Sequence, residues 1–132
     1  MEFYKKACEL NEAYGCTKLA QIYQDDKIDQ VDVSLALSYY EKACTLGDGF
    51  GCTNLGWAYQ KGQLGLKVDE FKAHDIYFIG CSLKDGFACN NLGYMYANGV
   101  GVRKSIYTAK EYFGLSCDYE VPAGCRSYAL LT

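Results

Sequence analysis

The spacing of eight cysteines constrains this 132-residue chain more than any other feature. They form four pairs, and the members of each pair are eight residues apart, as in the stretch ACTLGDGFGC. The first cysteines of successive pairs are separated by 36, 37 and 36 residues. The pairs are Cys8 and Cys16, Cys44 and Cys52, Cys81 and Cys89, and Cys117 and Cys125. A period of this length indicates an array of structural repeats along the whole chain.

Each repeat carries the pattern of two amphipathic helices. An aromatic residue stands four positions before every first cysteine, namely Tyr4, Tyr40, Tyr77 and Phe113. After the second cysteine, apolar residues recur at the third, fourth and seventh positions, as in Leu55, Gly56 and Tyr59. This spacing is typical of the buried face of a helix. The sequence therefore predicts two helices for each repeat.

We call the helix that ends near a first cysteine a B helix, and the helix that begins near a second cysteine an A helix. The predicted B helices are 2–10, 33–46, 69–83 and 105–118, and the predicted A helices are 15–24, 51–61, 88–98 and 123 to the C-terminus. Glycines at 47, 49 and 51 are predicted to end helices, and Asp69 and Ser105 to cap the next ones. The predicted fold class is all-α, a single α/α solenoid domain over residues 1–132.

Two stretches carry a family resemblance. GCTNLGWAYQKG (51–62) and ACNNLGYMYANGVGV (88–102), each followed by an aromatic helix, resemble Sel1-like repeats, which are relatives of the tetratricopeptide repeats. The chain resembles in particular the cysteine-rich Sel1-like proteins of Helicobacter and its relatives. The resemblance implies about three and a half repeats. The first repeat departs from the pattern, with Ala20 in place of glycine and DDKIDQVD (25–32) in place of a G-x-G-V turn. Because the chain opens inside a B helix, we expect it to be part of a longer protein.

The cysteine pairs do not have the spacing of a metal or redox site. Zinc ligands commonly lie two to four residues apart, and no C-x-x-C motif occurs here. Eight cysteines allow 105 connectivities, but a solenoid brings only neighbouring repeats into contact. We therefore predict four sequential disulfides, each stapling a B helix to the next A helix; reduced core cysteines are the alternative. Stable disulfides indicate the periplasm, the cell surface or secretion, although this chain opens without a signal peptide.

Composition excludes several functional classes. The formal charge of −3 and the scattered lysines and arginines provide no basic stripe for nucleic acid. No apolar run approaches the roughly 20 residues of a membrane helix, so we expect no membrane insertion. We expect a monomer with no metal and no cofactor.

The resemblance also implies penicillin binding and weak β-lactamase activity. A serine β-lactamase needs S-x-x-K with S-D-N and K-T-G elements, which are missing from the sequence. A zinc β-lactamase needs several histidines, and the chain has only His74, which we expect to face solvent. We therefore predict no catalytic residue, and enzymatic activity stays an open alternative that the residues do not favour.

The A helices of tetratricopeptide-like arrays line the concave side, so we expect a ligand groove there. The predicted groove residues are Thr53, Asn54, Trp57, Lys61, Asn90, Asn91, Tyr94, Asn98, Arg126 and Ser127. Thr17, Lys18, Gln21, Gln24 and Gln60 extend the row. Asparagine amides can pair with a peptide backbone, and tryptophan and tyrosine offer rigid contact area.

The predicted function is an extracytoplasmic interaction module that recognises a peptide, a protein or a peptidoglycan-derived fragment. Its alternatives are a solvated polar helix face without a ligand, and a spacer within a longer repeat protein. Most other tyrosines are predicted to pack between helices, namely Tyr4, Tyr23, Tyr39, Tyr40, Tyr59, Tyr77, Tyr96 and Tyr112.

Overall fold

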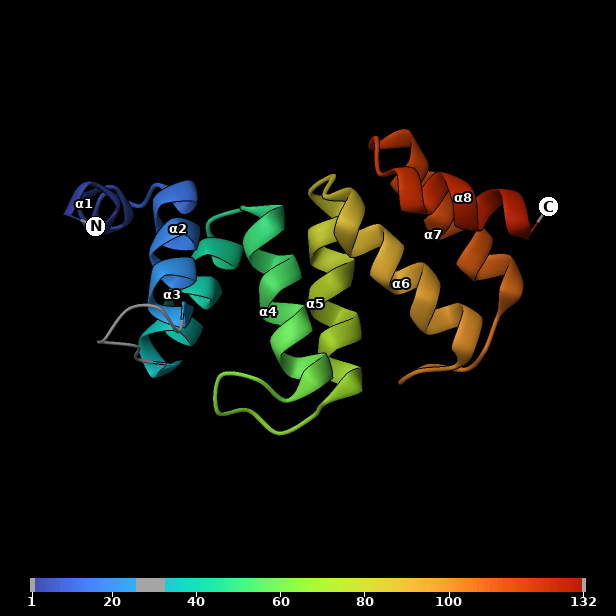
Figure 1. Cartoon of the computed structure of the whole chain (residues 1–132), viewed down its shortest axis with the longest axis horizontal. Coiled ribbons are helices and arrows are strands. Elements are labelled where there is room, and N and C mark those ends of the chain that lie inside the picture. The colour runs from blue at the N-terminus through green and yellow to red at the C-terminus, as the bar shows by residue number, and fades with distance from the viewer. Residues whose placement is uncertain (1, 26–32, 132) are drawn as a thin grey trace.

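The computed structural model describes residues 2–25 and 33–131 and confirms an all-helical solenoid (Figure 1). The B helices are α1 (Glu2–Glu9), α3 (Val33–Thr45), α5 (Glu70–Ser82) and α7 (Ile106–Asp118). The A helices are α2 (Ala13–Gln24), α4 (Gly49–Lys61), α6 (Gly86–Asn98) and α8 (Pro122–Leu130). They stand in chain order along the long axis, so the two ends of the chain are far apart. Residues 26–32 of the atypical first turn lie outside the described residues.

Four disulfides span the B-to-A turns, as the spacing predicted. They join Cys8 to Cys16, Cys44 to Cys52, Cys81 to Cys89, and Cys117 to Cys125, with Cα atoms 4.5 to 4.8 Å apart. All four turns have the same backbone conformation, in which one residue has a positive φ angle in the left-handed region. These residues are Asn11, Gly47, Lys84 and Glu120. The next amide then bonds back to the B helix, as Asp48 N–H does to the Ala43 carbonyl at 3.0 Å. The turns are therefore copies of one structure.

Glycine in the L-G-x-x-Y pattern allows the following B helix to approach closely. A Cβ atom at Gly56 would lie 2.6 Å from the Tyr77 ring, and one at Gly93 would lie 2.6 Å from the Phe113 ring. Tyr77 is fully buried and Phe113 is nearly so. Because glycine has no side chain, it leaves the space into which the buried aromatic ring of the next helix packs.

The buried tyrosine hydroxyls have matched partners. Tyr40 donates to Gln24 Oε1 at 2.7 Å, and Tyr77 donates to Gln60 Oε1 at 2.8 Å. The next repeat has Phe113 without a hydroxyl, and Ala97 occupies the position of the glutamine. Burial raises the pKa of Tyr40 to about 12, so its hydroxyl stays a donor at neutral pH.

Stacked tyrosines confirm the predicted inter-helix packing in two repeats. The rings of Tyr23 and Tyr39 lie 5.8 Å apart and those of Tyr96 and Tyr112 lie 5.6 Å apart. Each pair joins an A helix to the following B helix. These contacts lie beside the buried aromatic residues and enlarge the apolar interface between the two helices.

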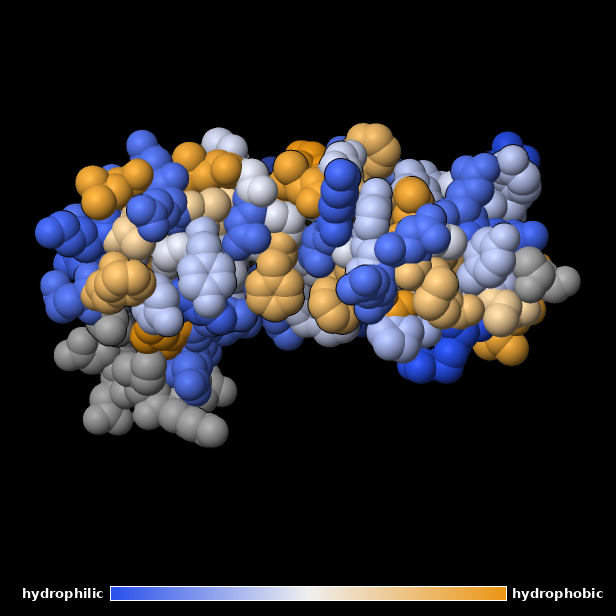
Figure 2. All heavy atoms as spheres, turned by 90° about the horizontal axis from the view of Figure 1, so that it is seen from above, coloured by the Kyte–Doolittle hydropathy of each residue, from blue (hydrophilic) through white to orange (hydrophobic). Residues whose placement is uncertain are grey.

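The A helices form the inner layer of the array. Helix α4 contacts both α2 and α6, and α6 also contacts α8, whereas consecutive B helices in the described parts have no comparable contact. Closer spacing on one side bends a stack of helix pairs toward that side. From above, over the stapled turns, apolar patches recur along the array between hydrophilic side chains (Figure 2).

Two details of the sequence prediction change. Helices α4 and α6 begin at Gly49 and Gly86, two residues before the predicted starts. Gly49 and Gly51 therefore lie inside a helix rather than ending one. A Cβ atom at Gly51 would lie 2.8 Å from Ala43 Cβ, so these glycines serve close helix approach. The predicted caps are confirmed, because Asp69 accepts from Lys72 N–H and Ser105 from Thr108 N–H.

Filling the space at Gly56 tests the close approach. Gly56→Ala should destabilise the fold by about 1–3 kcal/mol, because the fully buried Tyr77 ring has no free space to move into. Gly114→Ala is the matched control, since its Cβ would meet only the partly exposed Tyr128 ring at 3.3 Å. Alanine there should be neutral or slightly stabilising. Urea unfolding of both variants is the measurement, and equal midpoints for the two would contradict the role given to Gly56.

Candidate functional site

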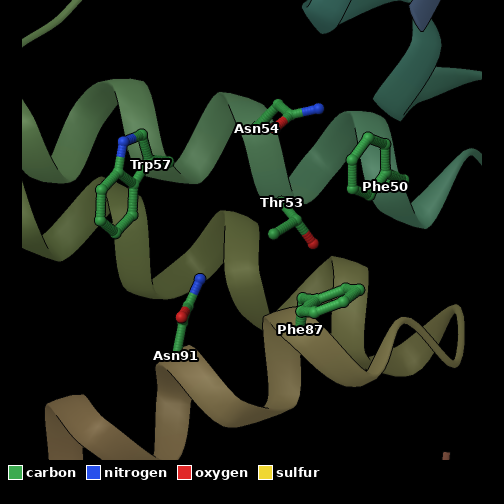
Figure 3. A pocket seen from close by; sticks show the side chains of 6 residues that line it. All are labelled: Phe50, Thr53, Asn54, Trp57, Phe87 and Asn91. Carbon is green, nitrogen blue, oxygen red and sulfur yellow. The ribbon is translucent and has the colours of Figure 1, made fainter. Parts of the chain in front are cut away.

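An apolar hollow of about 350 Å³ lies between α4 and α6 (Figure 3). Its walls are Phe50, Thr53, Asn54 and Trp57 from α4, and Phe87 and Asn91 from α6. Trp57 stands at one end, and Phe50 and Phe87 stand at the other. These three rings are 41 to 53 % exposed, which is high for large apolar side chains. The hollow therefore offers apolar surface that the chain itself does not cover.

A second hollow of about 300 Å³ adjoins the first and is more polar in composition. It is lined by Trp57, Gln60, Lys61, Asn90, Asn91 and Tyr94. Trp57 and Asn91 belong to both hollows. Lys61 Nζ lies 5.0 Å from the centre of the Trp57 ring, within cation–π distance. We call the two hollows together the α4–α6 groove.

The structure brings most of the predicted groove residues together. Thr53, Asn54, Trp57, Lys61, Asn90, Asn91 and Tyr94 all line the α4–α6 groove. Asn98, Arg126 and Ser127 do not line it. The amide of Asn98 donates to the Tyr94 carbonyl at 3.0 Å, within its own helix.

Sequence reasoning missed Phe50 and Phe87. Both precede the predicted starts of their helices, so neither was placed on a helical face. With α4 beginning at Gly49, Phe50 lies four residues before Asn54 and seven before Trp57. That spacing puts all three on one face. Extending the row of predicted groove residues by one helical turn toward the N-terminus of each helix would have included both phenylalanines.

Thr53 has a structural partner as well as a place in the groove. It is buried, and its hydroxyl donates to the Asp85 carboxylate across the repeat boundary and lies 3.0 Å from the Gly49 carbonyl. Thr17 donates to Asp48 in the same way one repeat earlier. Both aspartates precede the first residue of an A helix. The threonine hydroxyls therefore join successive repeats and are not free for a ligand.

Asn54 and Asn91 are not equivalent, although they occupy the same repeat position. Asn91 points from α6 toward α4 and hydrogen-bonds the hydroxyl of Tyr77. Burial raises the pKa of Tyr77 far above its ordinary value, and the bond from Asn91 offsets part of that rise. Asn54 Nδ2 is buried without a hydrogen-bond partner among the described residues. Asn54 is therefore the amide that no core bond holds in place.

The prediction that His74 faces solvent was wrong. Its side chain is only 20 % exposed. Nε2 lies 2.8 Å from the Tyr96 hydroxyl, and Nδ1 lies 3.2 Å from the carboxylate of the neighbouring Asp75. His74 thus links α5 to α6, and it lines neither hollow of the α4–α6 groove.

Comparison with known families identifies the class. The Sel1 repeat matches at residues 1–12, 13–48, 49–85 and 86–118, so the chain belongs to the Sel1 repeat family. Helicobacter pylori cysteine rich protein B is 36 % identical to it, with a TM-score of 0.76 over 95 % of this chain and 89 % of that one. No curated protein matches the chain.

Two further solved structures share the fold. The Sel1 repeat protein of Oxalobacter formigenes is 22 % identical, with a TM-score of 0.86 over 97 % of this chain and 96 % of that one. A protective antigen of uropathogenic Escherichia coli is 24 % identical, with a TM-score of 0.85 over 98 % of this chain and 28 % of that one. Identities this low establish the architecture alone.

The four disulfides indicate an oxidising environment outside the cytoplasm. In the described residues, no helix has both the length and the apolar character needed to cross a membrane.

The link between Thr53 and Asp85 predicts a pH dependence of stability. Burial raises the pKa of Asp85, and bonds from Thr53 and the backbone of Phe87 and Ala88 offset part of the rise. A carboxyl whose pKa is higher in the folded state stabilises the fold at low pH, and that contribution is lost as pH rises through the folded pKa. The stability of wild type relative to Asp85→Asn should therefore fall as the pH rises from the ordinary aspartate pKa of about 3.9 through the higher pKa of the folded protein.

Urea unfolding across that pH range measures the difference. The exposed Asp118→Asn variant controls for the loss of one negative charge. A wild type that gains stability over Asp85→Asn with rising pH would show that Asp85 ionises more easily in the folded protein.

Proposed function

We propose that this chain is an extracytoplasmic binding module that holds an extended peptide in the α4–α6 groove. The peptide belongs to a partner protein or to a cell-wall fragment, and the module is periplasmic, exposed on the cell surface or secreted. The observation that carries this proposal is the continuity of the two hollows through Trp57 and Asn91. A continuous path along the boundary between two repeats suits an extended chain better than a compact small molecule.

The dimensions of the groove suit one large side chain with backbone on either side. A hollow of about 350 Å³ with three aromatic walls favours an apolar side chain. The adjoining hollow offers the amides of Gln60, Asn90 and Asn91, and an amide can both donate to and accept from a peptide backbone. The groove follows α4 from Phe50 to Lys61, about 16 Å at about 1.5 Å per residue, which is the length of about five extended peptide residues.

The scaffold holds these walls in place before a ligand arrives. The Cys44–Cys52 and Cys81–Cys89 disulfides fix the turns that lead into α4 and α6. The Tyr77 hydroxyl donates to Gln60 and accepts from Asn91, which ties the polar end of the groove to α5. A preorganised surface loses little conformational entropy on binding. The helices that carry the aromatic rings are thus held in position before binding.

Selection from a phage-displayed library of random heptapeptides tests the proposal. Trp57, the only tryptophan, reports binding of each selected peptide by its fluorescence. Phe87→Ala should weaken binding by about 1.5–3 kcal/mol, because it removes an apolar wall. Asn54→Ala should weaken it by about 0.5–1.5 kcal/mol through a lost hydrogen bond. Phe71→Ala, on α5 and 75 % exposed, should have no effect.

Asn91→Ala needs a parallel stability measurement, because that side chain also bonds Tyr77. The proposal fails if the library yields no peptide above background. It fails equally if Phe71→Ala and Phe87→Ala weaken the selected peptides to the same extent.

A further inference from the structure

Charge is divided unevenly between the two layers of helices. The chain has sixteen acidic and thirteen basic residues. None of the acidic residues lies in α2, α4, α6 or α8, whereas these A helices contain Lys18, Lys61 and Arg126. The inner layer of an acidic protein is therefore basic.

Among the described residues, no aspartate or glutamate lies within ion-pair distance of these three cations. Lys61 lines the polar hollow and lies over the Trp57 ring. Lys18 occupies the repeat position of Asn54 and Asn91, and it lies 5.2 Å from the centre of the Tyr14 ring. Each lysine thus combines an unpaired charge with an aromatic face on the A-helix layer.

The carboxylates nearest to the groove do not cancel this charge. Asp48 and Asp85 stand at the N-termini of α4 and α6, where the helix dipole favours negative charge. Each accepts a bond from a threonine hydroxyl, and Asp48 also accepts from Phe50 N–H. Their charges are therefore directed toward the protein. Lys61 lies in the last turn of α4, at the opposite end of the groove.

We infer that the α4–α6 groove selects an acidic peptide segment with one aromatic or large aliphatic side chain, an inference that rests on the proposed function. The apolar side chain lies between Phe50, Trp57 and Phe87, and a neighbouring carboxylate pairs with Lys61. Lys18 on α2 and Arg126 on α8 add positive charge to the same inner layer on either side of the groove. Outside the A helices the chain has sixteen acidic and ten basic residues, and this net negative charge repels such a segment and directs it to the inner layer.

A basic or neutral segment fits these charges less well. A basic segment would bring its cations against Lys61 without a groove carboxylate that is free to pair with them. A neutral segment could occupy the apolar hollow but would leave Lys61 unpaired. The sign of the peptide's charge is therefore the property that distinguishes the candidate ligands.

The composition of peptides selected from the random heptapeptide library gives the direct test. Aspartate and glutamate should be enriched next to an aromatic or large aliphatic position. Synthetic copies with each acidic residue replaced by its amide should bind about two- to fivefold more weakly per replacement, the effect of one exposed ion pair. Raising the salt concentration from about 50 mM to about 500 mM should weaken the acidic peptides and leave the amide copies nearly unchanged.

Variants of Lys61 test whether this residue pairs with the carboxylate of the peptide. Lys61→Gln should weaken an acidic peptide about two- to fivefold, and Lys61→Glu should weaken it further, because repulsion replaces attraction. Lys5→Glu makes the same change of net charge on an exposed site of α1 and should have no effect. The amide copies should bind wild type and Lys61→Glu with similar affinity.

The outcomes separate this inference from the proposed function. Peptides that depend on Phe87 but show no acidic enrichment, or bind Lys61→Glu as tightly as wild type, would overturn the inference and leave the binding module intact. A library that yields no binder would overturn both.

Discussion

The disulfide across each B-to-A turn is the constraint on which the rest of this structure depends. It holds two Cα atoms 4.5 to 4.8 Å apart where one helix ends and the next begins. In the chain-entropy account, a loop this short is stabilised by about 2.5 kcal/mol. Three of the four turns also hold a residue other than glycine in the left-handed region, at Asn11, Lys84 and Glu120. The bridge thus maintains a backbone that such residues disfavour.

With the turns fixed, polar bonds between repeats set the position of the inner layer. Thr17 with Asp48, and Thr53 with Asp85, each connect one A helix to the start of the next. The corresponding position at the last boundary is Val121, which packs where a Cβ atom at Gly86 would come within 2.5 Å. The groove lies over the boundary between α4 and α6, where both the threonine bond and the tyrosine bonds are present. Its shape therefore depends on links that the last boundary lacks.

Much of this architecture follows from the sequence, because a repeated pattern reports the same structure several times. The helices, the four bridges and the recurring aromatics at Tyr40, Tyr77 and Phe113 were predicted from spacing. The groove positions on α4 and α6 were predicted from the resemblance to tetratricopeptide repeats. The starts of the A helices were not predicted correctly, because glycines beside a turn, such as Gly49 and Gly51, suggest a helix end unless the close approach of the helices is known. That error of about half a turn hid Phe50 and Phe87.

Contacts between distant residues were also beyond the sequence. The bond from His74 to Tyr96 joins residues 22 positions apart, and the bond from Thr53 to Asp85 joins residues 32 positions apart. Neither follows from the periodicity of a single helix. The difference between Asn54 and Asn91 arises in the same way, since only the structure shows that Asn91 reaches Tyr77.

The central claim is that the stapled solenoid presents its ligand site on the inner layer, over the α4–α6 boundary. Nuclear magnetic resonance titration of isotope-labelled protein with a selected heptapeptide tests it most directly, because every amide reports separately. The account predicts that the largest shifts fall on the Trp57 indole, the Asn54 side-chain amide and the first turns of α4 and α6. Shifts centred instead on the outer hollow between α5 and α7, which Phe78, Tyr112 and Leu115 help to line, would contradict it.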